Sequence, residues 1–172
     1  MNTSRAKVLF LCTGNSCRSQ MAEGWGRYLH SNRYDFFSAG IEKLGLNPLA
    51  VKVMAEAGVD ISGHSSKLLS ELAGITFDYV ITVCDQANEQ CPFFSGKAVK
   101  LHREFPDPPR LALKAASEEE ALGHYRAVRE AIREYLVTLP AVLGSIGAGA
   151  TPFLNRRFNH TVRARHAVPV FP

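Results

Sequence analysis

The chain has 172 residues, of which 46% are hydrophobic and 21% are charged, and this balance excludes a disordered protein. No apolar run is long enough for a membrane span, and the first residues lack the apolar core of a signal peptide, so we expect a cytoplasmic protein. The formal net charge of +4 arises mainly from arginines after residue 155, which argues against nucleic acid as a partner of the main domain.

The predicted elements alternate between strands and helices along the first 140 residues. Apolar runs rich in β-branched or aromatic residues predict four strands, at residues 7–12, 34–38, 78–84 and 98–102. Helical spacing and capping signals predict helices at residues 18–30, 48–58, 66–73 and 117–138. Asn47-Pro48 opens the second helix, and Ser117 with Glu120 forms a capping box at the last. The alternation predicts an α/β fold: one domain, residues 1–140, with a four-stranded parallel sheet flanked by helices.

The pattern changes after Pro140. Residues 144–149 are rich in glycine and alanine, and the remainder mixes arginines with prolines and isolated apolar residues. Such a segment cannot bury a continuous apolar face. We therefore expect residues 141–172 to be a loosely ordered, irregular C-terminal extension, and we expect the chain to act as a monomer.

A short polar segment, C-T-G-N-S-C-R-S at residues 12–19, lies between the first predicted strand and the helix that follows it. Backbone N–H groups of such a loop and of the helix N-terminus converge on one point, where they favour a tetrahedral oxyanion. Arg18 adds a planar guanidinium that can bind two oxygen atoms at once. The predicted oxyanion-binding residues are Thr13, Gly14, Asn15, Ser16, Cys17 and Arg18.

Cys12 stands at the mouth of this loop. The helix N-terminus and the Arg18 charge favour the thiolate, the nucleophilic form of a cysteine, and Ser19 can donate a hydrogen bond to the sulfur. The alternative is a buried cysteine at the end of a strand, with Arg18 on the surface, because a bare Cys-x5-Arg spacing also occurs by chance. The strand, the glycine loop, the serine and the helix together favour a catalytic Cys12.

The run C-T-G-N-S-C-R-S-Q-M-A-E-G, residues 12–24, resembles the active-site loop of low-molecular-weight tyrosine phosphatases and of the thioredoxin-coupled arsenate reductases that share their fold. The form S-Q-M-A-E-G is more similar to the reductases, because the phosphatases usually have proline after the serine. The resemblance extends over about residues 6–138 and implies the same α/β fold. It also implies an enzyme that reduces arsenate to arsenite.

Two further cysteines, Cys84 and Cys91, occur in the segment V-C-D-Q-A-N-E-Q-C-P. Cys84 ends the third predicted strand, at the edge of a parallel sheet where ligands bind, and Cys91 follows seven residues later in a polar loop that we expect to be mobile. A structural zinc site is the alternative, but the cysteine spacings do not match the usual zinc pairs and no histidine partner is placed nearby. Redox chemistry is therefore favoured, and no metal site is predicted.

The resemblance implies a relay of three sulfur atoms. Cys12 would form a covalent adduct with arsenate, and Cys84 would then attack the Cys12 sulfur, release arsenite and leave a Cys12–Cys84 disulfide. Exchange with Cys91 would move the disulfide to a segment that thioredoxin, the implied electron donor, can reach. No bound cofactor is expected. Cys17 is expected to pack within the loop and is left out of the relay, although a protective disulfide with Cys12 is an alternative.

Asp107 in F-P-D-P-P matches the general acid of both families and could protonate the departing hydroxyl group. Its alternative role is that of an ordinary turn residue before proline. Cys12, Arg18 and Asp107 would also suffice for a phosphatase, which would leave Cys84 and Cys91 without a role. A third alternative, a thiol-based sensor or arsenite-binding protein, would not need the acid.

Some of the similar reductases bind potassium beside the loop through an asparagine, a glutamate, a serine and an aspartate. Asn15, Glu23 and Ser38 match three of these positions, and Lys67 stands where the aspartate would be. We expect the lysine ammonium to take the place of the cation. This substitution predicts an activity that does not depend on potassium.

Overall fold

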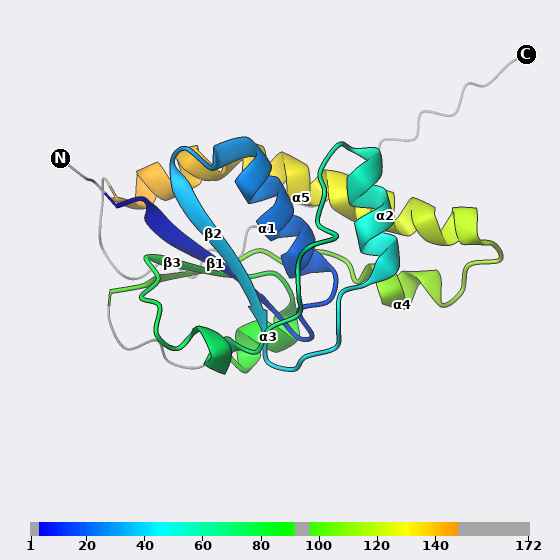
Figure 1. The fold of residues 1–172 in the computed structure, drawn as a ribbon, viewed down its shortest axis with the longest axis horizontal. Helices are drawn as coiled ribbons and strands as arrows, with labels where there is room; N and C mark the ends of the chain where they lie inside the picture. Colours follow the sequence, from blue (N-terminus) through cyan, green and yellow to red (C-terminus); the bar gives the residue numbers. More distant parts are fainter. Residues whose placement is uncertain (1–3, 92–96, 148–172) are drawn as a thin grey trace, which may run out of the picture. The chain divides into compact units, whose positions relative to one another are not determined.

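The computed structural model describes residues 4–91 and 97–147. Its strands are β1 (Ala6–Cys12), β2 (Tyr34–Gly40), β3 (Tyr79–Thr82) and β4 (Val99–His102). They form one four-stranded sheet in the order β2-β1-β3-β4, and every neighbouring pair is parallel (Figure 1). The predicted α/β fold with a parallel sheet is therefore confirmed.

The helices are α1 (Arg18–His30), α2 (Pro48–Glu56), the 3-10 helix η1 (Leu69–Leu72), α3 (Asp85–Glu89), α4 (Pro108–Ala112) and α5 (Glu118–Gly147). Helix α1 has the predicted bounds. The helix expected at residues 66–73 is reduced to one 3-10 turn, and the third strand ends at Thr82 rather than at Cys84. Helices α3 and α4 were not predicted, because five residues are too few to show a helical spacing of apolar side chains.

Helix α5 is longer than expected. It was expected to end near Thr138 and instead continues through Pro140, so residues 141–147 are helical rather than irregular. The apolar spacing that includes Leu139 continues at Leu143, which favours the helix beyond the proline.

The chain divides into two compact units at Pro140. The rest of the expected extension, residues 148–172, lies outside the described residues. The division into a domain and a loosely ordered extension therefore stays a prediction.

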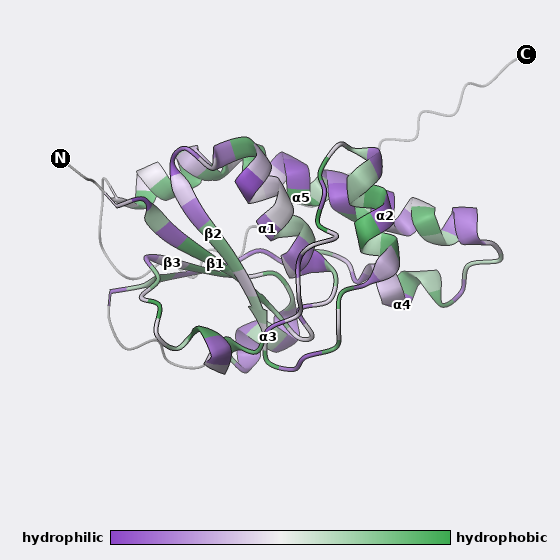
Figure 2. Ribbon diagram, viewed as in Figure 1, coloured by the Kyte–Doolittle hydropathy of each residue, from purple (hydrophilic) through white to green (hydrophobic). Residues whose placement is uncertain are grey.

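The sheet places its central strand in the core. In β1 the side chains of Val8, Leu9, Phe10 and Leu11 are fully buried. A strand that has neighbours on both sides and helices on its faces reads as a continuous apolar run, as the sequence of β1 does. Figure 2 shows hydrophobic residues along the strands and hydrophilic residues recurring on α1 and α5. Cys12, the last residue of β1, is buried as well, so the loop that follows it begins at a well-determined position.

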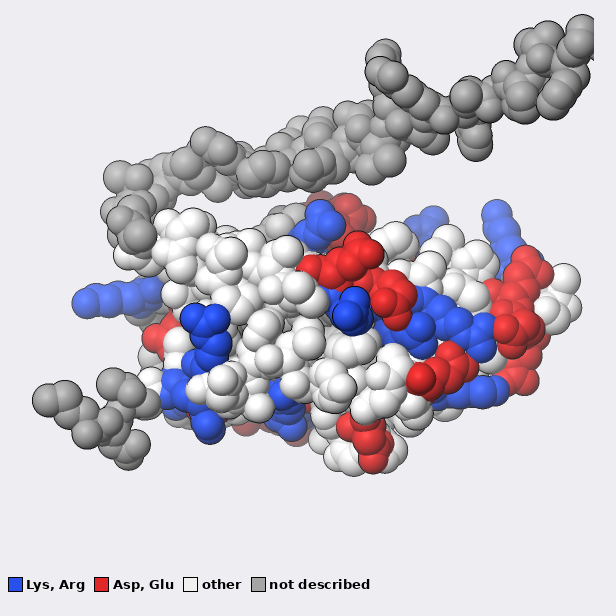
Figure 3. All heavy atoms as spheres, turned by 90° about the horizontal axis from the view of Figure 1, so that it is seen from above, with Lys and Arg blue, Asp and Glu red and all other residues white. Residues whose placement is uncertain are grey.

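Helix α1 is held against α5 and α2. Its Met21 and Trp25 are buried, and the ring of His30 makes a 2.7 Å hydrogen bond to the carbonyl oxygen of Leu136 in α5. Ion pairs join α2 to α5, at 2.8 Å for Arg126 with Glu56. Figure 3 shows such mixed charges side by side on one face of the molecule. These contacts determine the position of α1, whose first residue follows the loop after Cys12.

In the part of the chain that the structure describes, no helix is both long and apolar enough to cross a membrane.

Candidate active site

The carbonyl groups of the loop that follows Cys12 accept hydrogen bonds from a neighbouring segment of backbone. Backbone N–H groups of residues 41–47 donate to them: Ile41 to Cys12 at 3.3 Å, Glu42 to Thr13 at 2.8 Å, Leu44 to Gly14 at 3.1 Å and Asn47 to Ser16 at 2.9 Å. Within residues 4–91 and 97–147, the N–H groups of residues 13–17 have no hydrogen-bond acceptor. These N–H groups are available to an anion, as an oxyanion cradle requires.

Two positions allow this tight loop. Asn15 has a φ of +45°, in the left-handed region that asparagine tolerates better than most residues. At Gly40 of β2, an added Cβ would clash with the carbonyl oxygen of Glu42 and would lie 2.8 Å from the backbone nitrogen of Asn15. Only glycine lets β2 approach the loop this closely.

The Cys12 sulfur is hydrogen-bonded to the Ser19 hydroxyl group. Cys12 Sγ lies 2.8 Å from Ser19 Oγ, and Asn15 Nδ2 donates to the same hydroxyl oxygen at 2.9 Å. The Asn15 side chain is oriented because its Oδ1 accepts from the backbone N–H of Lys67 at 2.8 Å. When Cys12 is a thiolate, only the Ser19 hydroxyl can donate in this contact. The structure places the two predicted partners within hydrogen-bond distance.

Gln20 is a site residue that the sequence did not reveal. Its side chain is fully buried, and its Nε2 donates to the carbonyl oxygen of Asn15 at 3.1 Å and to the carbonyl oxygen of Ser65 at 3.0 Å. The side chain thus ties the loop to a segment 45 residues away. A glutamine on a helix is normally exposed, so its type and spacing carried no signal of this contact.

Arg18 and Asp107 meet at the mouth of the cradle. Arg18 Nη1 donates to the carbonyl oxygen of Phe105 at 3.0 Å, and Nη2 lies 3.6 Å from Asp107 Oδ1. The Arg18 side chain is 14% exposed and that of Asp107 is 40% exposed. Asp107 also begins α4 without capping it through its side chain, so the carboxyl group is not occupied by the turn. The structure brings both predicted residues to one place.

Cys84 lies beside the loop residue that follows Cys12. Its sulfur is 3.3 Å from Thr13 Oγ1 and accepts from the backbone N–H of Ala87 at 3.4 Å. The side chain is buried, and Cys84 caps the N-terminus of α3. The second thiol is therefore at the cradle rather than elsewhere on the sheet.

Comparison with known proteins identifies the family of this chain. Residues 7–145 match the family model described as low molecular weight phosphotyrosine protein phosphatase. The chain belongs to this family. Within it, the chain is 44% identical over 131 residues to the arsenate reductase of Bacillus licheniformis, which covers 76% of this chain and 92% of the relative.

Solved structures of both activities in the family share the fold. An arsenate reductase in the oxidized state has a TM-score of 0.63 and 29% identity, over 80% of this chain and 98% of that chain. A low molecular weight protein tyrosine phosphatase from T. tengcongensis has a TM-score of 0.62 and 27% identity, over 80% of this chain and 99% of that chain. The fold alone does not separate the two activities, so the side chains at the site must.

Cys91, the third predicted thiol, follows α3 and is half-buried. Burial raises the pKa of the Cys91 thiol, and the positive charge of Lys100 acts in the opposite direction. Most of the loop after Cys91, residues 92–96, lies outside the described residues, so its predicted mobility stays a prediction. In this structure Cys12, Cys17, Cys84 and Cys91 are all free thiols.

Cys17 has the environment of a packing residue. It is buried at the start of α1, and burial raises the pKa of its thiol far above the ordinary value. The neighbouring Cys12 raises the pKa further, and Arg18 lowers it by less. A thiol of this kind stays protonated at neutral pH and is a poor nucleophile.

The expectation for Lys67 is wrong. Its ammonium donates to the carbonyl oxygen of Ser65 at 2.8 Å instead of taking the place of a cation beside Glu23. The buried Glu23 carboxylate is paired with His64 Nδ1 at 3.0 Å and with Arg27 at 3.5 Å. The physical reason is that Glu23 is already engaged by Arg27, four residues further along α1, and by His64 from a separate segment. The order of residues along the chain did not show the contact with His64.

The pairing of Glu23 with His64 and Arg27 also affects how a potassium ion could bind beside the loop. Ser38 Oγ is buried and has no hydrogen-bond partner among the described residues, so it is the one group of the set that remains unengaged. Each Glu23 oxygen already has one partner, so a cation there would compete with His64 and Arg27. In the described ranges there is also no cluster of three or more His, Cys, Asp or Glu side chains that could bind a metal. That the activity does not depend on potassium stays a prediction.

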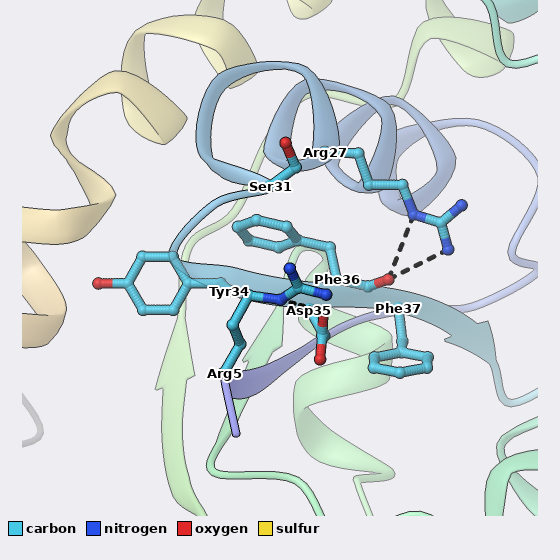
Figure 4. Close-up of a pocket in the computed structure, with 7 residues that line it drawn as sticks. All are labelled: Arg5, Arg27, Ser31, Tyr34, Asp35, Phe36 and Phe37. Carbon is cyan, nitrogen blue, oxygen red and sulfur yellow. Dashed lines mark hydrogen bonds and ion pairs between the residues drawn. The ribbon is translucent and has the colours of Figure 1, made fainter. Parts of the chain in front are cut away.

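A separate depression of about 410 Å³ lies at the other end of β2. It is lined by Arg5, Arg27, Ser31, Tyr34, Asp35, Phe36 and Phe37 (Figure 4). Both guanidinium groups are engaged there, Arg5 with Asp35 at 2.8 Å and Arg27 with the Phe36 carbonyl oxygen at 3.2 Å. Because it lies at the amino end of the strand while the cradle lies at the carboxyl end, this depression is not the active site.

Proposed function

We propose that this chain is an arsenate reductase that uses Cys12, Cys84 and Cys91 in turn. The observation that carries the proposal is the 3.3 Å contact between the Cys84 sulfur and Thr13, the residue next to Cys12. A phosphatase needs a single nucleophilic thiol, because water completes its reaction. A reductase needs a second thiol at the cradle, since two electrons must be supplied.

The first step is the attack of the Cys12 thiolate on arsenate. The N–H groups of the loop and the Arg18 guanidinium bind the oxyanion, while the Ser19 hydroxyl donates to the sulfur and holds it as a thiolate. Asp107, next to Arg18, supplies a proton to the departing hydroxyl group, which leaves as water. A bond between sulfur and arsenic forms.

The second step is the attack of Cys84 on the Cys12 sulfur. The Thr13 hydroxyl and the Ala87 N–H stabilise the Cys84 thiolate. A Cys12–Cys84 disulfide forms, and the electron pair of the sulfur–arsenic bond stays on arsenic. Arsenite is thereby released as the two-electron reduced product.

The third step regenerates the cradle. Cys91 exchanges with the disulfide and carries it away from Cys12 as a Cys84–Cys91 disulfide. We propose thioredoxin as the electron donor that reduces it, and a reducing cytoplasm as the compartment, because the Cys84–Cys91 disulfide must be returned to two thiols after each turnover.

The replacement Cys84→Ser tests the proposal. The assay follows NADPH oxidation in the presence of arsenate, thioredoxin and thioredoxin reductase. The wild-type chain should consume NADPH continuously, and the variant should not. Cys17→Ser is the matched control, since it also removes a buried thiol near Cys12 and should keep turnover. Arsenate reduction by Cys84→Ser at the wild-type rate would show that the second thiol has no role.

The alternative is a phosphatase, the activity after which the matched family is described. Cys12, Arg18 and Asp107 have the geometry for phosphoester hydrolysis. Hydrolysis of para-nitrophenyl phosphate should survive the Cys84→Ser change, because the phosphatase reaction does not use that thiol. A chain that hydrolyses this ester and fails to reduce arsenate would be a phosphatase.

A further inference from the structure

The hydroxyl group of Thr13, the loop residue next to Cys12, lies beside two acceptors. Its oxygen is 3.3 Å from the Cys84 sulfur and 3.3 Å from Gln86 Oε1. A hydroxyl group has one proton, and a glutamine Oε1 accepts hydrogen bonds without donating them. When Thr13 donates to Gln86, its proton is not available to the sulfur, and the contact between Thr13 and Cys84 then has the thiol as its donor. The two neighbours therefore compete for a single proton.

The outcome of this competition affects whether Cys84 is a thiol or a thiolate. A thiolate accepts hydrogen bonds and cannot donate them, so it is favoured when the Thr13 proton points to it. The Cys84 side chain is only 4% exposed, and a buried negative charge is costly unless donors surround it. The backbone N–H of Ala87 is one donor, at 3.4 Å. Thr13 is the second donor, and it is the one that Gln86 can withdraw.

Gln86 is placed to withdraw the Thr13 proton and to return it. It lies in the first turn of α3, its side chain is exposed, and its bond to Thr13 is the one hydrogen bond of that side chain within the described residues. The neighbouring carboxylate, Asp85, is bound by the His102 ring at 2.9 Å instead. If the Gln86 amide rotates, Nε2 donates to the Thr13 oxygen and the threonine proton becomes available to the sulfur. An exposed glutamine can make this change without disturbing the core.

We propose that Gln86 is a positioning residue for the second step, which controls when Cys84 becomes nucleophilic through the one proton of Thr13; this inference rests on the proposed reductase function. While Thr13 donates to Gln86, Cys84 remains a thiol. When the Thr13 proton turns to the sulfur, the Cys84 proton is lost to solvent, and the thiolate attacks the Cys12 sulfur. The bond between sulfur and arsenic breaks, and its electron pair stays on arsenic. Gln86 adds no electrons and no chemical group to this step.

The pH profile of Cys84 alkylation tests the proposal. The reduced full chain reacts with iodoacetamide across about pH 6–10, and peptide mass spectrometry follows Cys84 and Cys12 separately. Gln86→Leu removes the competing acceptor at similar size, so Cys84 should react about two- to tenfold faster near neutral pH, with the midpoint of its profile displaced downward. Cys12 should keep its wild-type profile in this variant. Gln86→Glu keeps a permanent acceptor beside Thr13 and should displace the Cys84 midpoint upward.

Two controls separate the hydrogen bond from other effects. In a Thr13→Val background, which removes the hydroxyl group, Gln86→Leu should leave the Cys84 midpoint unchanged, because no proton remains to compete for. Gln90→Glu adds the same charge as Gln86→Glu, but at the residue that caps the C-terminal end of α3. It should leave the Cys84 profile of the wild-type chain unchanged.

Three outcomes would overturn the role of Gln86: an unchanged Cys84 midpoint in Gln86→Leu, a displacement of equal size in the Thr13→Val background, or a displacement in the same direction by Gln86→Leu and Gln86→Glu. The second of these would show that Gln86 acts without the Thr13 hydroxyl. The proposed function is tested separately, by NADPH oxidation with arsenate in the wild-type chain. Absence of that activity would refute the reductase, whereas the alkylation profiles would still decide whether Gln86 controls the Cys84 proton.

Discussion

The loop after Cys12 is held by buried contacts, whereas the segment from Cys84 to Cys91 is held largely by exposed ones. In the loop, carbonyl groups are bound by neighbouring backbone, and the side chains of Asn15, Ser19 and Gln20 are fully buried. Helix α3 has five residues and is held by exposed contacts from β4, such as the pair of His102 with Asp85.

This contrast corresponds to two different tasks. Oxyanion binding requires donors that are oriented before the substrate arrives, and buried, fully bonded groups provide this. A sulfur that changes partners requires contacts that break easily, and exposed ion pairs contribute little to stability. We infer that the loop is the rigid part of the site and that α3 is the part that rearranges.

The change with the largest expected effect on the rigid part is Arg18→Lys. Arg18 uses one nitrogen on the Phe105 carbonyl oxygen and directs another toward Asp107, and a single ammonium cannot do both while binding the oxyanion. We expect kcat/KM for arsenate to fall at least about 100-fold. Arg5→Lys, at the depression on β2, is the matched control and should keep full activity. A loss of less than a few-fold in Arg18→Lys would mean that charge alone suffices.

A smaller effect is expected from Ser19→Ala. The variant removes the hydroxyl that can donate to the Cys12 thiolate at 2.8 Å, and a lost hydrogen bond to a charged group costs about 1.5–3 kcal/mol, or about 10- to 100-fold. Rapid-quench measurement of the first arsenate turnover reports this step. Asn15→Asp sharpens the test, since a carboxylate oxygen in place of Nδ2 would take the Ser19 proton away from the sulfur. If both variants react at the wild-type rate, the chain of bonds from Asn15 to Cys12 has no role in catalysis.

The smallest effect concerns potassium. Because both oxygens of Glu23 are engaged by His64 and Arg27, we expect the same steady-state rate in potassium and sodium at equal ionic strength. The prediction that the activity does not depend on potassium was first based on Lys67. It is kept here because Glu23 is engaged by other side chains. Substantial stimulation by potassium would show that the ion displaces one of these two partners.

The sequence predicted the elements that have strong local signals. The bounds of α1 agree, and Asn47 caps α2 as expected, with its Oδ1 accepting from the N–H groups of Leu49 and Ala50. At α5 the Ser117 hydroxyl accepts from the N–H of Glu120 as the capping box predicts. Such signals are readable because they act between residues that are close in sequence.

The parts that escaped prediction depend on residues distant in sequence. The pairing of Glu23 with His64 and the contact of Thr13 with Cys84 each join separate elements, and residue type alone does not reveal them. In the site, Cys12, Arg18, Ser19 and Asp107 could be identified from motifs, whereas Gln20 could not, because a buried glutamine on a helix has no pattern of its own.

The most direct test of the account is to trap the intermediate that joins the two regions. The replacement Cys91→Ser removes the third thiol, so one equivalent of arsenate should convert the reduced protein to a stable Cys12–Cys84 disulfide and release one equivalent of arsenite. Peptide mass spectrometry under non-reducing conditions identifies the pair. Arsenite release with a Cys12–Cys17 disulfide, or with no disulfide, would contradict the transfer of electrons from Cys84.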